Sequence, residues 1–115
     1  MMYTEIKKMS GILTQCWSLE TSSKWTLDNP AKGQCGVTAL VVHDLFDGEI
    51  MKTKVSEGWH FYNFINGERY DFTASQFLEA ITYMDVPSSR IEAFADTNEM
   101  QYGALKQNVR IHVKY

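Results

Sequence analysis

The sequence has little or none of several features that define common classes of protein. Its 115 residues include two cysteines and two prolines, and no apolar run approaches the ~18–20 residues that span a bilayer. The N-terminal segment MMYTEIKKMSGILTQ lacks the apolar block and the small-residue cleavage site of a secretory signal. These absences predict a cytoplasmic protein without membrane contact, whose cysteines stay reduced because disulfides are rare in the cytosol.

An excess of basic residues is also missing. The chain has 11 Lys and Arg against 14 Asp and Glu, a net charge of −3 at pH 7. Nucleic-acid binding requires a basic surface that releases counterions, so we expect no nucleic acid among its partners. The composition, 44% hydrophobic and 22% charged, is instead typical of an ordered globular protein. Without internal repeats or low-complexity segments, residues 1–115 are predicted to form one domain.

Two segments of the N-terminal half have the hydrophobic pattern of helices. Residues 3–15 carry apolar side chains at helical spacing, at Ile6, Met9, Ile12 and Leu13. Residues 35–46 are apolar almost all round, which predicts a buried helix that ends before Gly48. Residues 17–33, between them, are rich in Ser, Thr, Asn, Pro and Gly and predict a long ordered loop. Loops of this length in compact domains are usually functional.

A hairpin is the clearest pattern in the second half. The segment EIMKTKV, residues 49–55, predicts a strand, and Asn66-Gly67 separates two aromatic-rich alternating runs in WHFYNFINGERYDFT. After the hairpin, Thr73 and Gln76 match a capping box, which predicts a helix toward Met84. The segment RIEAFA then predicts a short strand. A last helix is predicted over DTNEMQYGALKQNV, with Asp96 or Thr97 as its cap.

The hairpin determines which side chains face one another. A two-residue Asn-Gly loop pairs Ile65 with Glu68, so Tyr62 is predicted to face Asp71. Because side chains alternate along a strand, His60 and Asp71 lie on one face as diagonal neighbours, within reach of each other. A carboxylate at that position can accept a hydrogen bond from one ring nitrogen of His60 and direct the other nitrogen outward.

Cys35 opens the predicted buried helix, where the partial positive charge of unpaired N–H groups favours the thiolate. If that helix packs on the sheet face that carries His60, then Cys35, His60 and Asp71 converge as nucleophile, base and orienting carboxylate. Gly33 and Gly36 leave room for a substrate carbonyl, and the Cys35 amide is a candidate oxyanion donor.

The loop before the helix has two interpretations. It is either a turn segment anchored by Trp17 and Trp25, or one wall of a substrate cleft. In the second case Gln15, Ser18 or Gln34 is a candidate for the second oxyanion donor, and the sequence does not choose among the three. Cys16, beside Trp17, is most simply a core thiol near the end of the first helix.

These motifs resemble known families. A Cys that opens a helix, a His on a strand and an Asp in YDFT on the next strand are similar to the transglutaminase-like branch of the papain-like cysteine fold; the match covers residues 33–73. The segments CWSLETSSKW, GQCGVTALVV and WHFYNFINGERYDFTASQF resemble, over nearly the whole chain, the YunG-like family of small bacterial proteins. The first resemblance implies a papain-like fold and an acyl-enzyme chemistry.

The sequence therefore predicts an α+β domain of papain-like class, with a buried helix that starts at Cys35 and packs on a short antiparallel sheet. The predicted function is a thiol-dependent hydrolase or acyltransferase. Its substrate would be a small-molecule or peptide amide or thioester, and it would need no cofactor or metal. Two alternatives remain open. One is a catalytically silent binding or regulatory module of the same fold, and the other is a zinc site formed by Cys35, His43, His60 and Asp71.

Overall fold

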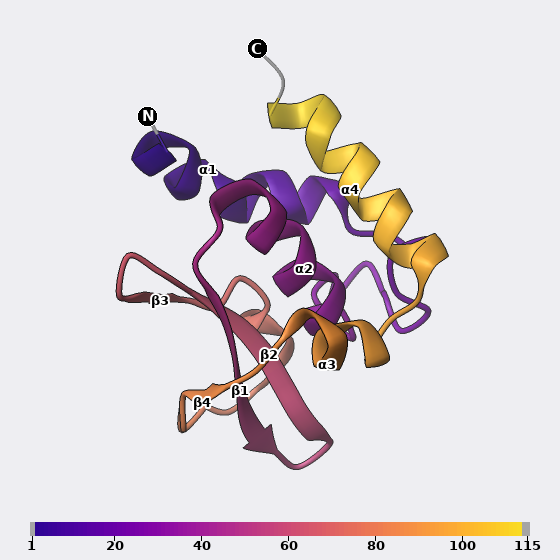
Figure 1. Cartoon of the computed structure of the whole chain (residues 1–115). Helices are drawn as coiled ribbons and strands as arrows, with labels where there is room; N and C mark the ends of the chain where they lie inside the picture. Colours follow the sequence, from indigo (N-terminus) through magenta and orange to yellow (C-terminus); the bar gives the residue numbers. More distant parts are fainter. Residues whose placement is uncertain (1, 114–115) are drawn as a thin grey trace.

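A buried helix lies at the centre of the molecule. The computed structural model describes residues 2–113, and the side chains of residues 6–113. Along this part of the chain the elements are α1 (Met2–Cys16), α2 (Cys35–Phe46), β1 (Glu49–Val55), β2 (Gly58–Ile65), β3 (Glu68–Tyr70), the 3-10 turn η1 (Ala74–Gln76), β4 (Val86–Pro87), α3 (Arg90–Ala95) and α4 (Glu99–Val113). Figure 1 shows α2 between the sheet on one side and α1 with α4 on the other.

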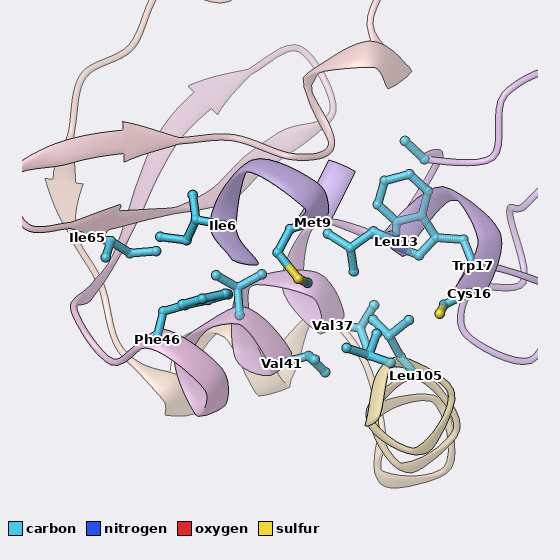
Figure 2. Close-up of a cluster of buried hydrophobic side chains, with 13 residues drawn as sticks. Ile6, Met9, Leu13, Cys16, Trp17, Val37, Val41, Phe46, Ile65 and Leu105 are labelled. Atoms are coloured by element: carbon cyan, nitrogen blue, oxygen red, sulfur yellow. The ribbon is translucent and has the colours of Figure 1, made fainter. Parts of the chain in front are cut away.

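The predicted burial of α2 is confirmed. Its residues 35–42 are all buried, and so is Phe46. The main core joins the apolar sides of α1, α2 and α4, and Figure 2 shows Ile6, Met9 and Leu13 of α1 lying along α2. A second cluster connects the start of α2 with the sheet and α3. Its buried members are Cys35, Ala39, Leu40, Ile50, Phe61 and Ala93.

The predicted hairpin is also confirmed. The four strands form an antiparallel sheet in the order β3-β2-β1-β4, and β2 pairs with β3 through Ile65–Glu68, Phe64–Arg69 and Asn63–Tyr70. Asn66 and Gly67 have φ values of 54° and 78°. Positive φ at both turn residues is the requirement of a type I′ turn, which explains why the sequence places Asn-Gly there.

The helix α2 packs on the sheet face opposite to the one that carries His60. The Asn63 side-chain amide donates to the Ala39 carbonyl of α2 at 3.1 Å, and Phe61 packs in the same interface. Since side chains alternate along β2, His60 and Tyr62 lie on the opposite face. The condition set for the convergence of Cys35, His60 and Asp71, that α2 packs on the face that carries His60, is therefore not met. Because β2 has large side chains on both faces, the hydrophobic pattern of the sequence does not indicate which face packs against the helix.

The segment after β3 covers the second face of the sheet. The helix predicted from Thr73 toward Met84 is wrong, because only the 3-10 turn η1 forms there. Thr73 makes no cap hydrogen bond, and its hydroxyl and N–H are directed to Asp71 instead. Residues 77–85, here called the strap, then run over β1, where the Thr53 hydroxyl donates to the Thr82 carbonyl and accepts from the Met84 N–H.

Two predictions for the C-terminal third need correction. RIEAFA forms the helix α3 rather than a strand, because the Ser89 hydroxyl accepts a hydrogen bond from the Glu92 N–H and caps it. The last helix is confirmed as α4, but it starts later than predicted. Asn98 accepts from the Gln101 N–H at its start, so neither Asp96 nor Thr97 is its cap. Within residues 2–113, no helix has both the length and the apolar character needed to cross a membrane.

The helical glycines provide a test of this packing. A Cβ on Gly36 would lie 2.7 Å from the Ala93 carbonyl oxygen and equally close to Asp96, whereas a Cβ on Gly103 of α4 meets nothing within 4 Å. Gly36→Ala should therefore lower the free energy of unfolding by about 1–3 kcal/mol, as overpacking does. Gly103→Ala, its matched control, should raise it by up to about 1 kcal/mol through helix propensity. Denaturant unfolding measures both, and a stabilised Gly36→Ala protein would contradict the close approach of α3 to α2.

Candidate active site

His60 and Asp71 form a buried pair. The Nε2 atom of His60 lies 2.7 Å from Oδ2 of Asp71, and the two side chains are 1% and 5% exposed. This contact confirms the diagonal pairing expected from the Asn66-Gly67 register. The same Asp71 oxygen accepts a hydrogen bond from the Tyr83 hydroxyl at 2.7 Å, while Oδ1 accepts a longer one from the Thr73 N–H at 3.3 Å.

The second ring nitrogen of His60 is left without a hydrogen bond from the described residues. Its Nδ1 is buried and makes no hydrogen bond to any residue of the part that the structure describes. Because a carboxylate only accepts hydrogen bonds, a neutral His60 carries its proton on Nε2 and has a lone pair on Nδ1. Phe77 of the strap packs edge-on against the ring at 4.9 Å, and Tyr62 stacks at 6.0 Å. The site therefore contains an oriented imidazole with one unused acceptor.

Cys35 has a different carboxylate partner from the predicted one. Its Sγ donates to Oδ2 of Asp96 at 3.4 Å, and the Gly36 N–H donates to the same oxygen at 3.1 Å. Asp96 follows α3 and therefore binds the N-terminal end of α2 from outside that helix. From the sequence, Asp96 is predicted only as a candidate helix cap. The two residues are 61 positions apart, and no local pattern connects them.

The pKa of the Cys35 thiol is raised to about 12. Burial is the largest cause and the charge of Asp96 the second, while a hydrogen bond from the Phe61 backbone N–H lowers the pKa. The expected lowering of this pKa by the helix N-terminus is therefore wrong for the described state. Desolvation of a side chain in a residue that is only 8% exposed outweighs the helix dipole. The Asp96 carboxylate also neutralises that end of the helix. Cys35 is consequently a protonated thiol at neutral pH.

The two pairs meet where β3 ends. In an antiparallel pair every second residue of a strand points its N–H toward the neighbouring strand. On β2, Ile65 and Asn63 point theirs toward β3, opposite Glu68 and Tyr70. The next N–H of β2 that points to the β3 side is therefore that of Phe61. β3 stops at Tyr70. The Phe61 N–H reaches the Cys35 sulfur instead, and the Asp71 charge also contributes to the raised pKa of Cys35. Cys35 thus lies beside Phe61, the residue that follows His60 on β2, and the described chain has no hydrogen bond between Cys35 and His60.

The predicted oxyanion donors occupy other positions. Gln34 is buried, and both ends of its amide are bound within the loop, to the Thr21 hydroxyl at 2.8 Å and the Pro30 carbonyl at 3.3 Å. The Ser18 hydroxyl accepts from the Glu20 N–H. Gln15 is an exposed residue of α1. None of the three has a recorded contact with Cys35 among the described residues, so the structure gives none of them an oxyanion role.

The aromatic residues and glycines of the loop are structural. Trp17 lies in the core and donates to the Thr38 hydroxyl at 2.9 Å, and Trp25 packs against the same core. Gly33 has a φ of 73° and lies against Ser22, where a Cβ would come within 2.5 Å of the hydroxyl oxygen. Gly36 remains part of the site, since its N–H holds Asp96. The interpretation of residues 17–33 as an anchored turn segment is therefore favoured over a cleft wall.

The other candidates lie away from this site. Cys16 is a buried core thiol, as predicted, with its Sγ 3.5 Å from Nδ1 of His112 on α4. His43 accepts a hydrogen bond from the Arg90 guanidinium at 2.9 Å and is two helical turns along α2 from Cys35. The described side chains, those of residues 6–113, contain no group of three or more His, Cys, Asp or Glu arranged to hold a metal ion. The described residues give no support to the zinc alternative.

Neutralising Asp96 tests the assignment of the Cys35 partner. Asp96→Asn keeps an acceptor for the Gly36 N–H but removes the charge that raises the pKa of the thiol. That pKa should fall, so the rate of Cys35 alkylation by iodoacetamide at pH 9 should rise several-fold. Peptide mass spectrometry resolves Cys35 from Cys16, which serves as internal reference. Glu99→Gln removes an exposed charge nearby and should change nothing; an equal effect of both variants would contradict the assignment.

Comparison with known proteins places the chain in a family. The family model described as YunG protein matches residues 5–114. A Bacillus subtilis (strain 168) protein described as uncharacterized protein YunG is 58% identical over 102 residues, which cover 89% of each chain. No solved structure matches. The family match extends over nearly all of the chain, and the chain therefore belongs to the YunG family.

Proposed function

We propose that this protein is a thiol-dependent hydrolase or acyltransferase that acts on an amide or thioester through an acyl-enzyme on Cys35. His60 is the base and Asp71 its orienting carboxylate. The observation that carries this proposal is the buried His60–Asp71 pair, in which Nδ1 of His60 has no hydrogen bond from the described residues. His60 directly precedes Phe61 on β2. The Phe61 N–H in turn contacts Cys35. An imidazole with one nitrogen bound to a carboxylate and the other free is the arrangement that accepts a proton from a nucleophile.

The raised pKa of Cys35 determines how the thiol would react. With a pKa of about 12 the thiol holds its proton at neutral pH, so no standing thiolate–imidazolium pair is involved. The sulfur would instead lose its proton to Nδ1 of His60 as it attacks the substrate carbonyl. The Asp71 carboxylate, 2.7 Å from Nε2, stabilises the imidazolium that forms. General-base assistance of this kind contributes about 10²–10⁴-fold to a rate.

The remaining steps follow from proton balance. The imidazolium of His60 returns its proton to the leaving amine or thiol, and the acyl group stays on Cys35. Water gives hydrolysis if it attacks this acyl-enzyme, and an amine gives acyl transfer. In both cases His60 accepts the proton of the incoming nucleophile and passes it to the Cys35 sulfur as the acyl–sulfur bond breaks, which restores the thiol and the neutral imidazole.

Asp96 must release the thiol before this chemistry starts. In the described state Oδ2 of Asp96 accepts both the Cys35 S–H and the Gly36 N–H. Movement of Asp96 away from these groups would free the sulfur for His60. It would also leave the Gly36 N–H at the start of α2, where an oxyanion is stabilised by the helix dipole.

A papain-like architecture is part of the proposal. The order of a helix that starts with Cys35, a strand that carries His60 and an Asp71 after the following strand supports it. The observed α+β arrangement, with α2 packed on an antiparallel sheet, is compatible with that order.

A catalytically silent binding or regulatory module is the second candidate. The low exposure of Cys35, 8%, and its protonation at neutral pH favour this alternative, because both slow the reaction with a substrate. The buried Nδ1 of His60 favours the enzyme, since an unsatisfied buried polar atom costs free energy and a catalytic role explains why the protein retains it.

Acylation by a simple thioester distinguishes the two. We expect an acetyl thioester of N-acetylcysteamine to add one acetyl group to the wild-type protein, on Cys35 and not on Cys16. Cys35→Ala should abolish this, Cys16→Ala should retain it, and His60→Gln should slow it by about 10²–10⁴-fold. Intact-protein and peptide mass spectrometry follow the reaction. Acetylation of both cysteines at similar rates, unaffected by His60→Gln, would leave the silent module as the better account.

A further inference from the structure

The strongest feature outside the three proposed residues is the Tyr83 hydroxyl. It lies 2.7 Å from Oδ2 of Asp71, the same oxygen that binds Nε2 of His60 at 2.7 Å. Burial, and next the hydrogen bond to Asp71, raise the pKa of Tyr83. The hydroxyl is therefore protonated throughout the neutral range and acts as a donor to the carboxylate.

The distances indicate that Tyr83 is the main restraint on Asp71 besides His60 itself. Among the described residues, the other donors to this carboxylate are the N–H and the hydroxyl of Thr73, which reach Oδ1 at 3.3 and 3.4 Å. Hydrogen bonds weaken as they lengthen beyond about 3.2 Å for N–H and 3.0 Å for O–H donors. The Tyr83 contact is short and made to the oxygen that His60 uses, so it determines how that oxygen is directed.

The strap holds Tyr83 in place by contacts on both sides of it. Thr53 of β1 binds the Thr82 carbonyl at 3.0 Å and the Met84 N–H at 2.9 Å. Next along the chain, Asp85 accepts from the Tyr62 hydroxyl at 2.7 Å and from Arg69 at 2.8 Å. Asp85 has a φ of 54°, which is unfavourable for a non-glycine residue. These contacts keep the turn at residues 83–85 in one conformation.

The Tyr83 ring has contacts of its own. It packs edge-on against Tyr62 at 5.0 Å, and the Arg69 guanidinium lies over it at 4.2 Å from the ring centroid. Both contacts involve the ring and not the hydroxyl. Tyr83→Phe would retain them and remove only the hydrogen bond to Asp71, so packing and positioning can be separated.

From this geometry we infer that Tyr83 is a positioning residue for His60. This inference rests on the proposed role of His60 as base. Its hydroxyl holds the Asp71 carboxylate so that Oδ2 faces Nε2, and the strap presents that hydroxyl while it closes the His60 face of the sheet. His60 is thereby kept in one orientation, with the proton on Nε2 and the lone pair on Nδ1. Tyr83 itself neither contacts the substrate nor transfers a proton.

The ring proton of His60 reports this role directly. In protein labelled with ¹⁵N-histidine, the Nε2-bound proton of wild-type His60 should give one resonance that exchanges slowly with water. Tyr83→Phe should speed that exchange at least tenfold, because the carboxylate gains freedom to turn away and water enters the space of the hydroxyl. Tyr70→Phe is the matched control. It removes a surface hydroxyl that donates to Glu68 and should leave the His60 proton unchanged.

A second variant tests the strap independently of the hydroxyl. Thr53→Val keeps the side-chain shape but removes both hydrogen bonds to residues 82 and 84, so the His60 proton should again exchange faster. If Tyr83→Phe and Thr53→Val both leave this exchange as in the wild type, Tyr83 only packs and the inference is wrong.

The thioester reaction provides the second readout. Cys35 acylation should be about tenfold slower in Tyr83→Phe and unchanged in Tyr70→Phe. If the wild type forms no acyl-enzyme but Tyr83→Phe still speeds exchange of the His60 proton, the positioning role is supported and the proposed function fails. Acylation in the wild type with no change in either readout on Tyr83→Phe would retain the function and overturn the inference.

Discussion

The register of one hairpin is the constraint on which the candidate site depends. Asn66 and Gly67 close a two-residue turn in which both residues have positive φ, and this fixes Asn63 opposite Tyr70. A slip by one residue would place Asp71 on the other face of the sheet, because side chains alternate with a period of two. The buried contact between His60 and Asp71 thus exists because a local turn sets the alignment of two strands.

Two carboxylates near one thiol have opposite effects. Asp71 binds Nε2 of His60 and leaves Nδ1 as a free acceptor. Asp96 accepts a hydrogen bond from the Cys35 S–H, and its charge is the second-largest cause, behind burial, of the raised pKa that keeps the thiol protonated. The described state therefore combines a base with a free lone pair and a nucleophile that still has its proton. Proton transfer during attack, rather than a preformed ion pair, is the chemistry that such a state supports.

The parts of the fold that the sequence predicts are those governed by neighbouring residues. The Asn-Gly turn, the strand at residues 49–55 and the buried helix at residues 35–46 each have a pattern within a short window, and all three are confirmed. The His60–Asp71 contact could be predicted for the same reason, since the two residues flank one turn. The match of nearly the whole chain to the YunG family agrees with the resemblance in its motifs.

Long-range competition explains what the sequence does not predict. Thr73 and Gln76 match the sequence motif of a helix cap, but the Asp71 side chain accepts hydrogen bonds from the Thr73 N–H and hydroxyl. Only one 3-10 turn follows. The strap is held by Thr53, which lies on a strand far earlier in the chain. Asp96 reaches Cys35 across 61 residues, and Gly36 permits this approach because it has no Cβ. None of these contacts leaves a periodic signal.

The pH dependence of Cys35 alkylation in the wild type and in His60→Gln tests most directly the claim that His60 takes the thiol proton. We expect wild-type Cys35 to react with iodoacetamide already near neutral pH, because His60 accepts the thiol proton during the attack. Its rate there should exceed that of a thiol with a pKa of about 12, and His60→Gln should abolish this excess. If both proteins instead follow the same curve, with reactivity only as the thiol itself ionises, His60 does not act on Cys35 and the claim is contradicted.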